Sequence, residues 1–302
     1  MANQVTVRVP GKINLQLSVG PLQSDGYHEL ATVFQSVSLF DEIQVTEIEP
    51  AEIRIESEGK VAIPLGKENL AYRAAELMRN RFEIESGLTI KIKKEIPMAG
   101  GMAGGSADAG GTIVAIDSLF SLGLSRTEME EIGSELGADV PFTISGGTAI
   151  GTGRGDQITP VLSRGTYNWV LALSSSGLST PAVYNECDRL REGMVISKPN
   201  VSDALMQALS HGDAKALGKS LSNDLQAAAC SLKPALRLIL DVGLDYGALG
   251  GLVSGSGPTV AFLAENEDHA LDLVVALTSS GVVGNVIRVA GPVPGARVIT
   301  NG

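Results

Sequence analysis

Apolar and polar residues alternate along four segments in the first hundred residues. The segments are 4–10 (QVTVRVP), 42–49 (EIQVTEIE), 51–58 (AEIRIESE) and 88–96 (LTIKIKKEI). A period of two places the apolar side chains on one face of a strand. Antiparallel sheets often keep one face in water, whereas buried parallel strands are apolar throughout. The alternation therefore predicts antiparallel strands with one differently covered face.

Several segments between and after these strands are predicted to be helices. Residues 69–82 carry apolar side chains at helical intervals, and Asn69 is a candidate N-cap. Residues 106–120 are predicted to form a helix that begins at Ser106. The segment 125–136 opens with the Ser-x-x-Glu of a capping box and ends at a glycine, and Pro141 suits the first turn of a fourth helix.

The segment 145–161 is rich in turn residues and indicates a boundary. Beyond it, 167–176 is typical of a buried strand, and 248–265 predicts a strand, a glycine turn and a second strand. Further helices are predicted near 182–191, 201–210, 234–241 and 267–280. Strands and helices mix without a strict βαβ period, so we predict an α+β fold of two domains, 1–160 and 161–302.

Composition narrows the class of protein. The 302 residues are 44% hydrophobic and 19% charged, which is typical of globular domains. A net charge of −11 argues against a nucleic-acid-binding surface, although a local group of N–H donors can still bind a nucleotide phosphate. The N-terminus lacks a signal-peptide pattern and no apolar run is long enough for a membrane span, so we expect a soluble, cytoplasmic protein. Cys187 and Cys230 are expected to be reduced thiols.

The segment 97–108, PMAGGMAGGSAD, has almost no side chains between a predicted strand and a predicted helix. Successive N–H groups and a helix N-terminus favour a phosphate there, while the alternative is a packing turn of small residues. The segment is not a P-loop, and Met102 breaks the dinucleotide G-x-G-x-x-G pattern. The one Gly-Lys-Ser of the chain, 218–220, follows Asp213 where the P-loop needs a glycine.

Four other features are candidates for chemistry, and each has an ordinary structural alternative. SGSGPT (254–259) is either a second phosphate-closing turn or a simple strand turn. Lys12 is either a functional cation or an outward-facing strand residue, and Asp139 is either a base or a helix cap. Tyr27 and His28 lie after an Asp-Gly turn and suit either packing or stacking on a base.

PGKIN, DGYHEL, PMAGGMAGGSAD, LGADVPF and SGSGPT occur in the order found in the GHMP small-molecule kinases, and the chain resembles this family over nearly its whole length. The resemblance implies a two-domain fold, with an N-terminal domain like ribosomal protein S5 domain 2 and a ferredoxin-like C-terminal domain. DGYHEL and LGADVPF further imply transfer of the ATP γ-phosphoryl group to the 2-hydroxyl of a methylerythritol unit. That acceptor carries a cytidine diphosphate group and belongs to the non-mevalonate isoprenoid pathway.

The resemblance also implies roles for single residues. Asp139 would take the hydroxyl proton and Lys12 would hold Asp139 and the developing alkoxide. ATP would lie against Asn69 and the glycine loop, which is Pro97, Met98, Ala99, Gly100, Gly101, Met102, Ala103, Gly104, Gly105, Ser106 and Ala107. Mg²⁺ would accompany ATP, with Ser106 as a candidate ligand. The acceptor would contact Asn14, Tyr27, His28, Tyr184 and Gly257.

Two departures from the family pattern lead to expectations of their own. Ala99 and Ala103 replace glycines, so both are expected to have negative φ. Asp108 replaces a common asparagine, and its side chain is expected to point away from ATP. Two rival functions remain: another GHMP kinase, such as a homoserine, mevalonate or galactose kinase, and a regulator that binds nucleotide without catalysis. We expect a small-molecule substrate, no nucleic-acid or membrane partner, and a monomer or weak homodimer.

Overall fold

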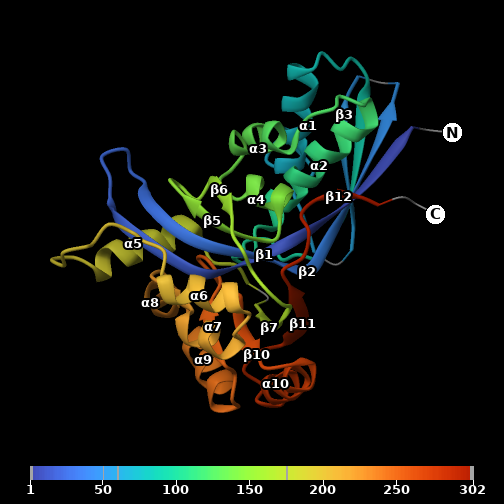
Figure 1. The fold of residues 1–302 in the computed structure, drawn as a ribbon. Helices are drawn as coiled ribbons and strands as arrows, with labels where there is room; N and C mark the ends of the chain where they lie inside the picture. Colours follow the sequence, from blue (N-terminus) through green and yellow to red (C-terminus); the bar gives the residue numbers. More distant parts are fainter. Residues whose placement is uncertain (1–2, 50, 60, 175, 300–302) are drawn as a thin grey trace.

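The structure is a computed structural model that describes residues 3–49, 51–59, 61–174 and 176–299. Two long antiparallel strands, β1 (Gln4–Leu22) and β2 (His28–Ile48), cross the middle of the molecule (Figure 1). The alternation predicted only their outer ends. In the middle of β1, 10–17, apolar and polar residues still alternate in the sequence, but every position is buried, so the polar face is covered as well as the apolar one.

β1 and β2 form the centre of an eight-stranded sheet whose main order is β12-β1-β2-β4-β3. β4 (Gly87–Lys93) pairs antiparallel with β2, as predicted. β3 (Ile53–Glu58) pairs parallel with β4, so the antiparallel prediction is wrong for this strand. The parallel partner is possible because the connection from β3 to β4 includes a helix, as parallel crossovers require.

The turn-rich segment 145–161 forms a β-hairpin. β5 (Thr148–Thr152) pairs with β2, and β6 (Gln157–Pro160) pairs with β5. Its glycines Gly146, Gly147, Gly153 and Gly155 all have positive φ, which accounts for the turn-rich composition. This segment is therefore part of the N-terminal sheet.

Four helices cover this sheet (Figure 1): α1 (Leu70–Arg81), α2 (Gly104–Phe120), α3 (Arg126–Ser134) and α4 (Val140–Ser145). Asn69 caps α1 and the capping box of α3 is present, so both predictions are confirmed. α2 begins two residues earlier than predicted: its N-cap is Ala103, and Ser106 lies inside the helix. The glycines hid this start because they carry no helix signal of their own.

The C-terminal half has an antiparallel sheet in the order β11-β7-β10-β9. Its strands are β7 (Tyr167–Leu173), β9 (Gly250–Val253), β10 (Val260–Ala264) and β11 (Asn285–Gly291). Its helices are α5 (Thr180–Leu190), α6 (Asp203–His211), α7 (Ala214–Ser220), α8 (Gln226–Leu232), α9 (Ala235–Asp245) and α10 (Glu267–Ser279). The predicted strand–turn–strand and the helices near 182–191, 201–210, 234–241 and 267–280 are confirmed.

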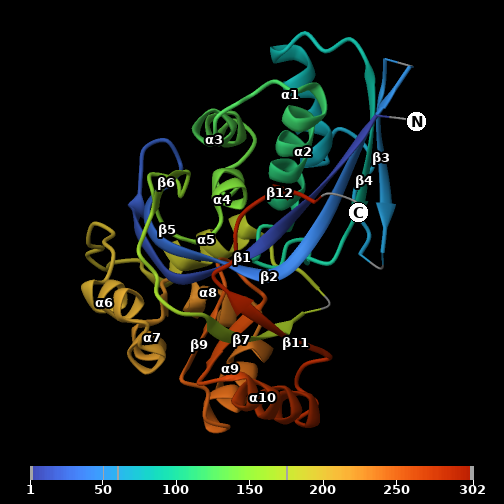
Figure 2. The ribbon, with the colours of Figure 1, turned by 45° about the vertical axis from the view of Figure 1, so that its right-hand side comes forward.

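The two halves share strands and core. β8 (Ser222–Asn223) and β12 (Arg297–Val298) come from the C-terminal half but pair with β1, and Figure 2 shows the last segment (red) returning to the N-terminal sheet. The buried Trp169 donates from Nε1 to Gln35 Oε1 at 2.9 Å. The domain division at residue 160 stays a prediction. No helix in the described ranges is both long and apolar enough to cross a membrane.

Candidate active site

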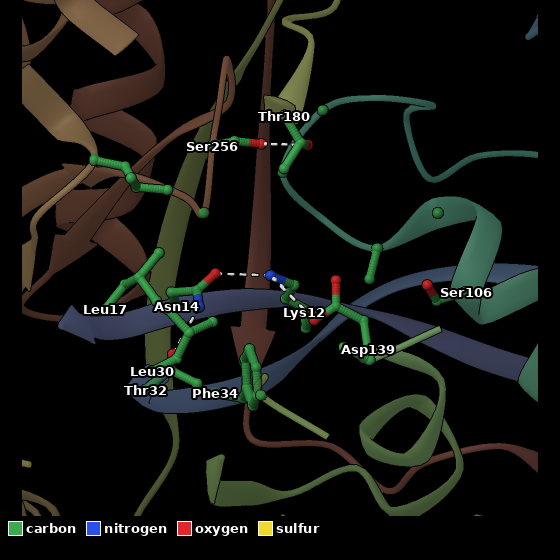
Figure 3. A pocket seen from close by; sticks show the side chains of 18 of the residues that line it. Lys12, Asn14, Leu17, Leu30, Thr32, Phe34, Ser106, Asp139, Thr180 and Ser256 are labelled. Carbon is green, nitrogen blue, oxygen red and sulfur yellow. Dashed lines mark hydrogen bonds and ion pairs between the residues drawn. The ribbon is translucent and has the colours of Figure 1, made fainter. Parts of the chain in front are cut away.

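A cavity of about 360 Å³ lies where β1, β2, the glycine loop, the start of α4 and the β9–β10 turn meet (Figure 3). We call it the central cavity. Lys12 and Asp139 both line it, and their side chains point toward each other, with Lys12 Nζ 3.8 Å from Asp139 Oδ1. These residues are far apart in sequence, and the fold brings them to one point.

The structure argues against the ordinary structural alternative for both residues. The side chain of Lys12 is only 5% exposed, so it is not an outward-facing strand residue, whereas that of Asp139 is 35% exposed. Asp139 is the N-cap residue of α4 by position, but its side chain makes no capping hydrogen bond. Its carboxylate is therefore directed to the cavity. Burial lowers the pKa of Lys12, and the Asp139 carboxylate partly opposes this shift by raising it.

A chain of hydrogen bonds orients Lys12. Its ammonium donates to Asn14 Oδ1 at 2.7 Å, and Asn14 Nδ2 donates to Thr32 Oγ1 at 2.8 Å. Thr32 in turn donates to the carbonyl of Gln16 at 2.7 Å. Because the Thr32 hydroxyl donates to that carbonyl, it can accept from Asn14, which fixes the amide with its oxygen toward Lys12. Asn14 lines the central cavity and its observed contact is with the lysine, while its contact with the acceptor stays a prediction.

The glycine loop forms one wall of the central cavity. Seven of its predicted residues line the cavity: Ala99, Gly100, Gly101, Ala103, Gly104, Gly105 and Ser106. Pro97, Met98, Met102 and Ala107 do not. Met102 is fully buried, and its carbonyl accepts from the backbone N–H of Lys12 at 3.2 Å, which ties the loop to β1.

The second glycine turn, 254–259, packs directly on this loop. Ser254 Oγ donates to the carbonyl of Gly101 at 2.9 Å, and the N–H of Thr259 donates to the carbonyl of Gly100 at 3.2 Å. A Cβ on Gly101 would lie 2.0 Å from the Ser254 carbonyl oxygen. The packing alternative therefore applies at Gly101, and phosphate binding by the glycines that line the cavity stays a prediction. A Cβ on Gly105 would meet only ordinary contacts at 3.5 Å and beyond.

The prediction that Ala99 and Ala103 have negative φ is wrong. Their φ angles are +50° and +59°, in the left-handed region. Ala103 is the N-cap of α2, where the chain reverses into the helix, and this turn needs the conformation that glycine would adopt freely. Both alanines thus adopt a left-handed backbone conformation, which disfavours any side chain.

A second cavity of about 820 Å³, which we call the outer cavity, adjoins the first. Tyr27, His28 and Tyr184 line it, and Tyr184 also lines the central cavity. The rings of His28 and Tyr184 lie 5.2 Å apart, tilted by 36°. His28 Nε2 lies 2.8 Å from Asp188 Oδ1, a contact that orients the imidazole. Burial raises the pKa of the Tyr184 hydroxyl, which keeps it protonated.

Besides the four residues of the glycine loop named above, two more predicted ligand residues lie outside both cavities. The Asn69 side chain is used locally: it accepts from the N–H of Ala71 at 2.8 Å and donates to the carbonyl of Pro64 at 2.7 Å. Gly257 faces Val253, and its neighbours Gly255 and Ser256 line the central cavity instead. The roles of Asn69 and Gly257 stay predictions.

Sequence reasoning missed several residues of the site. Thr180 and Ser256 bridge the cavity by a hydroxyl pair 2.9 Å apart (Figure 3), and Asp188 holds His28. Arg154 lines both cavities. SGSGPT already pointed to Ser256, and a single cation in the glycine-rich GTGRGD could have drawn attention to Arg154. Thr180 and Asp188 lack such a local signal.

Under the glycine loop lies a buried cluster of charges. Lys94 Nζ contacts Asp41 Oδ2 at 2.6 Å and Asp108 Oδ2 at 2.8 Å, and it donates to the carbonyl of Gly104 at 2.8 Å. All three charged side chains are at most 2% exposed. Asp108 does not line the central cavity, and its side chain is directed to Lys94 instead.

Ser106 is the residue predicted to be a ligand of Mg²⁺. Ser106 lies at the start of α2 on the Asp139 side of the central cavity (Figure 3). Within the described ranges there is no group of three or more His, Cys, Asp or Glu residues placed to hold a metal. Mg²⁺ usually keeps waters and is bound through phosphate oxygens with one or two protein ligands, so the role of Ser106 stays a prediction.

Comparison with known proteins agrees with this geometry. The pattern of the GHMP kinases N terminal domain matches residues 69–147, and that of the GHMP kinases C terminal matches residues 205–283. The curated protein named 4-diphosphocytidyl-2-C-methyl-D-erythritol kinase from Nocardia farcinica (strain IFM 10152) is 50% identical over 98% of this chain and 96% of its own. The protein of that name from Thermobifida fusca (strain YX) is 48% identical over 98% of both chains.

Solved structures give the same fold. A crystal structure of 4-(cytidine 5'-diphospho)-2C-methyl-D-erythritol kinase matches with a TM-score of 0.78 at 30% identity, over 95% of this chain and 99% of that one. Homoserine kinase from Cytophaga hutchinsonii ATCC 33406 matches with a TM-score of 0.76 over 99% and 98% of the two chains, but at 18% identity it shares the fold alone. The predicted α+β, two-domain fold is confirmed. The chain belongs to the GHMP kinase family, on the branch whose relatives at 48–50% identity are named 4-diphosphocytidyl-2-C-methyl-D-erythritol kinase.

Proposed function

We propose that this protein phosphorylates the 2-hydroxyl of 4-diphosphocytidyl-2-C-methyl-D-erythritol with ATP, in the non-mevalonate pathway to isoprenoid precursors. The observation that carries the proposal is the Lys12–Asp139 pair, which faces the glycine loop across one cavity. The adjoining cavity, lined by Tyr27, His28 and Tyr184, has the aromatic surface that a pyrimidine base needs.

The donor phosphates are assigned to the glycine-loop wall. The N-terminus of α2 points its unpaired N–H groups and positive dipole end at this wall, which favours an anion. Gly105 leaves room for close approach of a phosphate. Ser106 would supply one oxygen to Mg²⁺, and the metal would neutralise charge on the ATP phosphates when bound.

The acceptor hydroxyl is assigned to Asp139. The carboxylate would accept the proton of the 2-hydroxyl as the bond to phosphorus forms, and the buried Lys12 ammonium would stabilise the developing negative oxygen. Phosphoryl transfer requires mostly positioning and charge stabilisation, which a fixed Lys–Asp pair can provide. The Asn14–Thr32 hydrogen bonds hold the lysine in place for this role.

The pyrimidine is assigned to the outer cavity. Tyr27 and Tyr184 offer ring faces for stacking, and His28, held by Asp188, offers its other ring nitrogen to the edge of a base. Homoserine and mevalonate have no base to stack, so these side chains would have no use in kinases for those substrates.

A coupled assay of ADP formation tests the proposal. The purified chain is given ATP, Mg²⁺ and, in turn, the cytidyl acceptor, homoserine and mevalonate. We expect turnover with the cytidyl acceptor alone and a phosphorylated product by mass spectrometry. Turnover with homoserine or mevalonate alone would overturn the proposal. ATP binding without turnover of any acceptor would support the rival regulator.

We further propose that the protein acts in the cytoplasm on this small molecule as a monomer or weak homodimer, without a nucleic-acid or membrane partner. The net charge of −11 supports the absence of a nucleic-acid partner. Light scattering across a range of concentrations measures the oligomeric state, and a tight oligomer at all concentrations would contradict this expectation.

A further inference from the structure

The passage between the two cavities has a single shared cation. Five residues line both cavities: Leu30, Ala138, Arg154, Thr180 and Tyr184. Any ligand that reaches from the outer cavity to the Lys12–Asp139 pair must pass these side chains. Among the lining residues that the structure describes, Arg154 is the one Lys or Arg common to both cavities.

Arg154 lies in the turn between β5 and β6 and reaches across to the turn between β1 and β2. Its guanidinium carbon lies 3.7 Å from the centroid of the Tyr27 ring, and its Nη2 lies 3.2 Å from Asp25 Oδ2. The cation–π contact fixes the plane of the guanidinium. The ion pair is exposed, since the side chain of Arg154 is 53% exposed and that of Asp25 is 50% exposed. An exposed ion pair contributes little, so a stronger anion can displace Asp25.

The charges of the side chains around the passage indicate the role of Arg154. The outer cavity is otherwise acidic on its walls, with Glu135, Asp156 and Asp188 among its lining residues. In the central cavity, the Lys12 ammonium is already held by Asn14 and faces Asp139. A diphosphate crossing this region would meet carboxylates without a compensating cation unless Arg154 provides it.

We propose that Arg154 binds the diphosphate group of the acceptor as it passes between the two cavities, exchanging Asp25 for phosphate oxygens. The inference rests on the proposed function and adds a specificity-determining residue to it. The planar fork of arginine matches two phosphate oxygens at once, which gives both energy and orientation. The same residue would then link base stacking on Tyr27 to the position of the reacting hydroxyl.

The competing explanation is structural, because Arg154 also joins two hairpins through Tyr27 and Asp25. If Arg154 is only a structural pin between the two hairpins, its loss affects binding of every molecule in the outer cavity, including an uncharged nucleoside. If Arg154 binds phosphate, its loss affects only molecules that carry phosphate. Cytidine and cytidine diphosphate share the base and differ in this respect, so they separate the two explanations.

Calorimetric titration of the full chain with cytidine diphosphate and with cytidine is the test. We expect Arg154→Met to weaken binding of the diphosphate by about 10- to 100-fold, the range for a hydrogen-bonded charge, while cytidine affinity changes by less than about twofold. Arg154→Lys should recover part of the loss. In steady-state kinetics the KM for the acceptor should rise and the KM for ATP should not.

Arg237→Met is the matched control, since Arg237 is exposed on α9 and lines neither cavity. It should leave both titrations unchanged. Equal losses for cytidine and cytidine diphosphate in Arg154→Met would overturn the inference in favour of the structural pin, and so would no loss at all. A wild-type chain that binds neither ligand would overturn the cytidyl assignment itself, and this inference with it.

Discussion

Lys12 is a nearly fully buried cation, and the side chain of its ion-pair partner Asp139 is 35% exposed. Burial lowers the lysine pKa and the carboxylate counteracts that shift, so the protonation of Lys12 depends on the charge of Asp139. The two residues therefore act as a unit. Removing either one changes the remaining partner as well, and single-site effects should not add.

Asp139→Asn tests this unit at the residue level. The amide keeps the size of the side chain but cannot accept the hydroxyl proton, so we expect kcat to fall by about 10²- to 10⁴-fold. The loss of the carboxylate should also lower the pKa of Lys12 further, since Asp139 is the group that raises it. Steady-state kinetics and an unchanged circular dichroism spectrum are the measurements.

Asp241→Asn serves as the control for Asp139→Asn, because Asp241 is exposed on α9 and does not line the central cavity. It should retain wild-type kcat. Full turnover by Asp139→Asn would show that the carboxylate is not the base.

The glycine loop shows how one element can meet two demands. Gly101 is needed for packing against the Ser254 carbonyl, and its φ is +77°, whereas Gly105 faces the central cavity with room for a methyl group. The sequence shows only a row of glycines. Which of them packs and which faces the cavity depends on contacts such as that of Gly101 with Ser254, 153 positions away, and the local sequence pattern carries no information about these.

Alanine substitutions at Gly101 and Gly105 should therefore differ in kind. Gly101→Ala combines positive φ with a backbone clash and should lower the free energy of unfolding by at least about 2 kcal/mol. Gly105→Ala lies in the first turn of α2 and should change stability by less than about 1 kcal/mol. Urea unfolding measures both, and equal losses would contradict the distinction.

The Lys94 cluster ties both ends of the glycine loop. Asp41 Oδ1 accepts from the N–H groups of Glu95 and Ile96, just before the loop, while Lys94 holds the carbonyl of Gly104 at its end. Burial, with Asp41 nearby, raises the pKa of Asp108 to about 8, although the Lys94 ammonium opposes the shift. The cluster should therefore respond to pH.

Asp108→Asn tests that response. In the unfolded chain an Asp loses its proton near pH 4, but in the folded chain Asp108 keeps it to about pH 8, so this residue lowers stability progressively as the pH rises between those values. The asparagine cannot ionise. The Tm of the variant minus that of the wild type should thus rise from pH 5 to pH 8 and then level off. A difference independent of pH would contradict the raised pKa.

At the scale of the whole molecule, a feature can be predicted from the sequence when neighbouring residues encode it. Period-two strands, capped helices and the five ordered motifs were sufficient for the α+β fold, the Lys12–Asp139 pair and the glycine loop. The middle of β1 alternates in the sequence, but its polar face is buried as well, and this burial depends on contacts that alternation does not reveal. His28–Asp188 and Tyr27–Arg154 join residues more than a hundred positions apart, so only the folded chain reveals them.

The shared core bears on whether the two predicted domains can separate. One buried apolar cluster contains Val7, Ile43 and Ile113 from the first half together with Trp169 and Leu205 from the second. β8 and β12 also complete the N-terminal sheet from the C-terminal half. An N-terminal fragment would expose this part of the core and leave one side of β1 unpaired.

We therefore expect the full chain to unfold in a single cooperative step, with the calorimetric and van't Hoff enthalpies equal. A fragment of residues 1–160 should retain secondary structure but lack sharp tertiary signals, because β1 loses the strands β8 and β12 that pair with it. Scanning calorimetry of the full chain and near-ultraviolet circular dichroism of the fragment are the measurements. Two separate thermal transitions, together with a cooperatively folding fragment, would show that the halves are independent and that their shared strands contribute little.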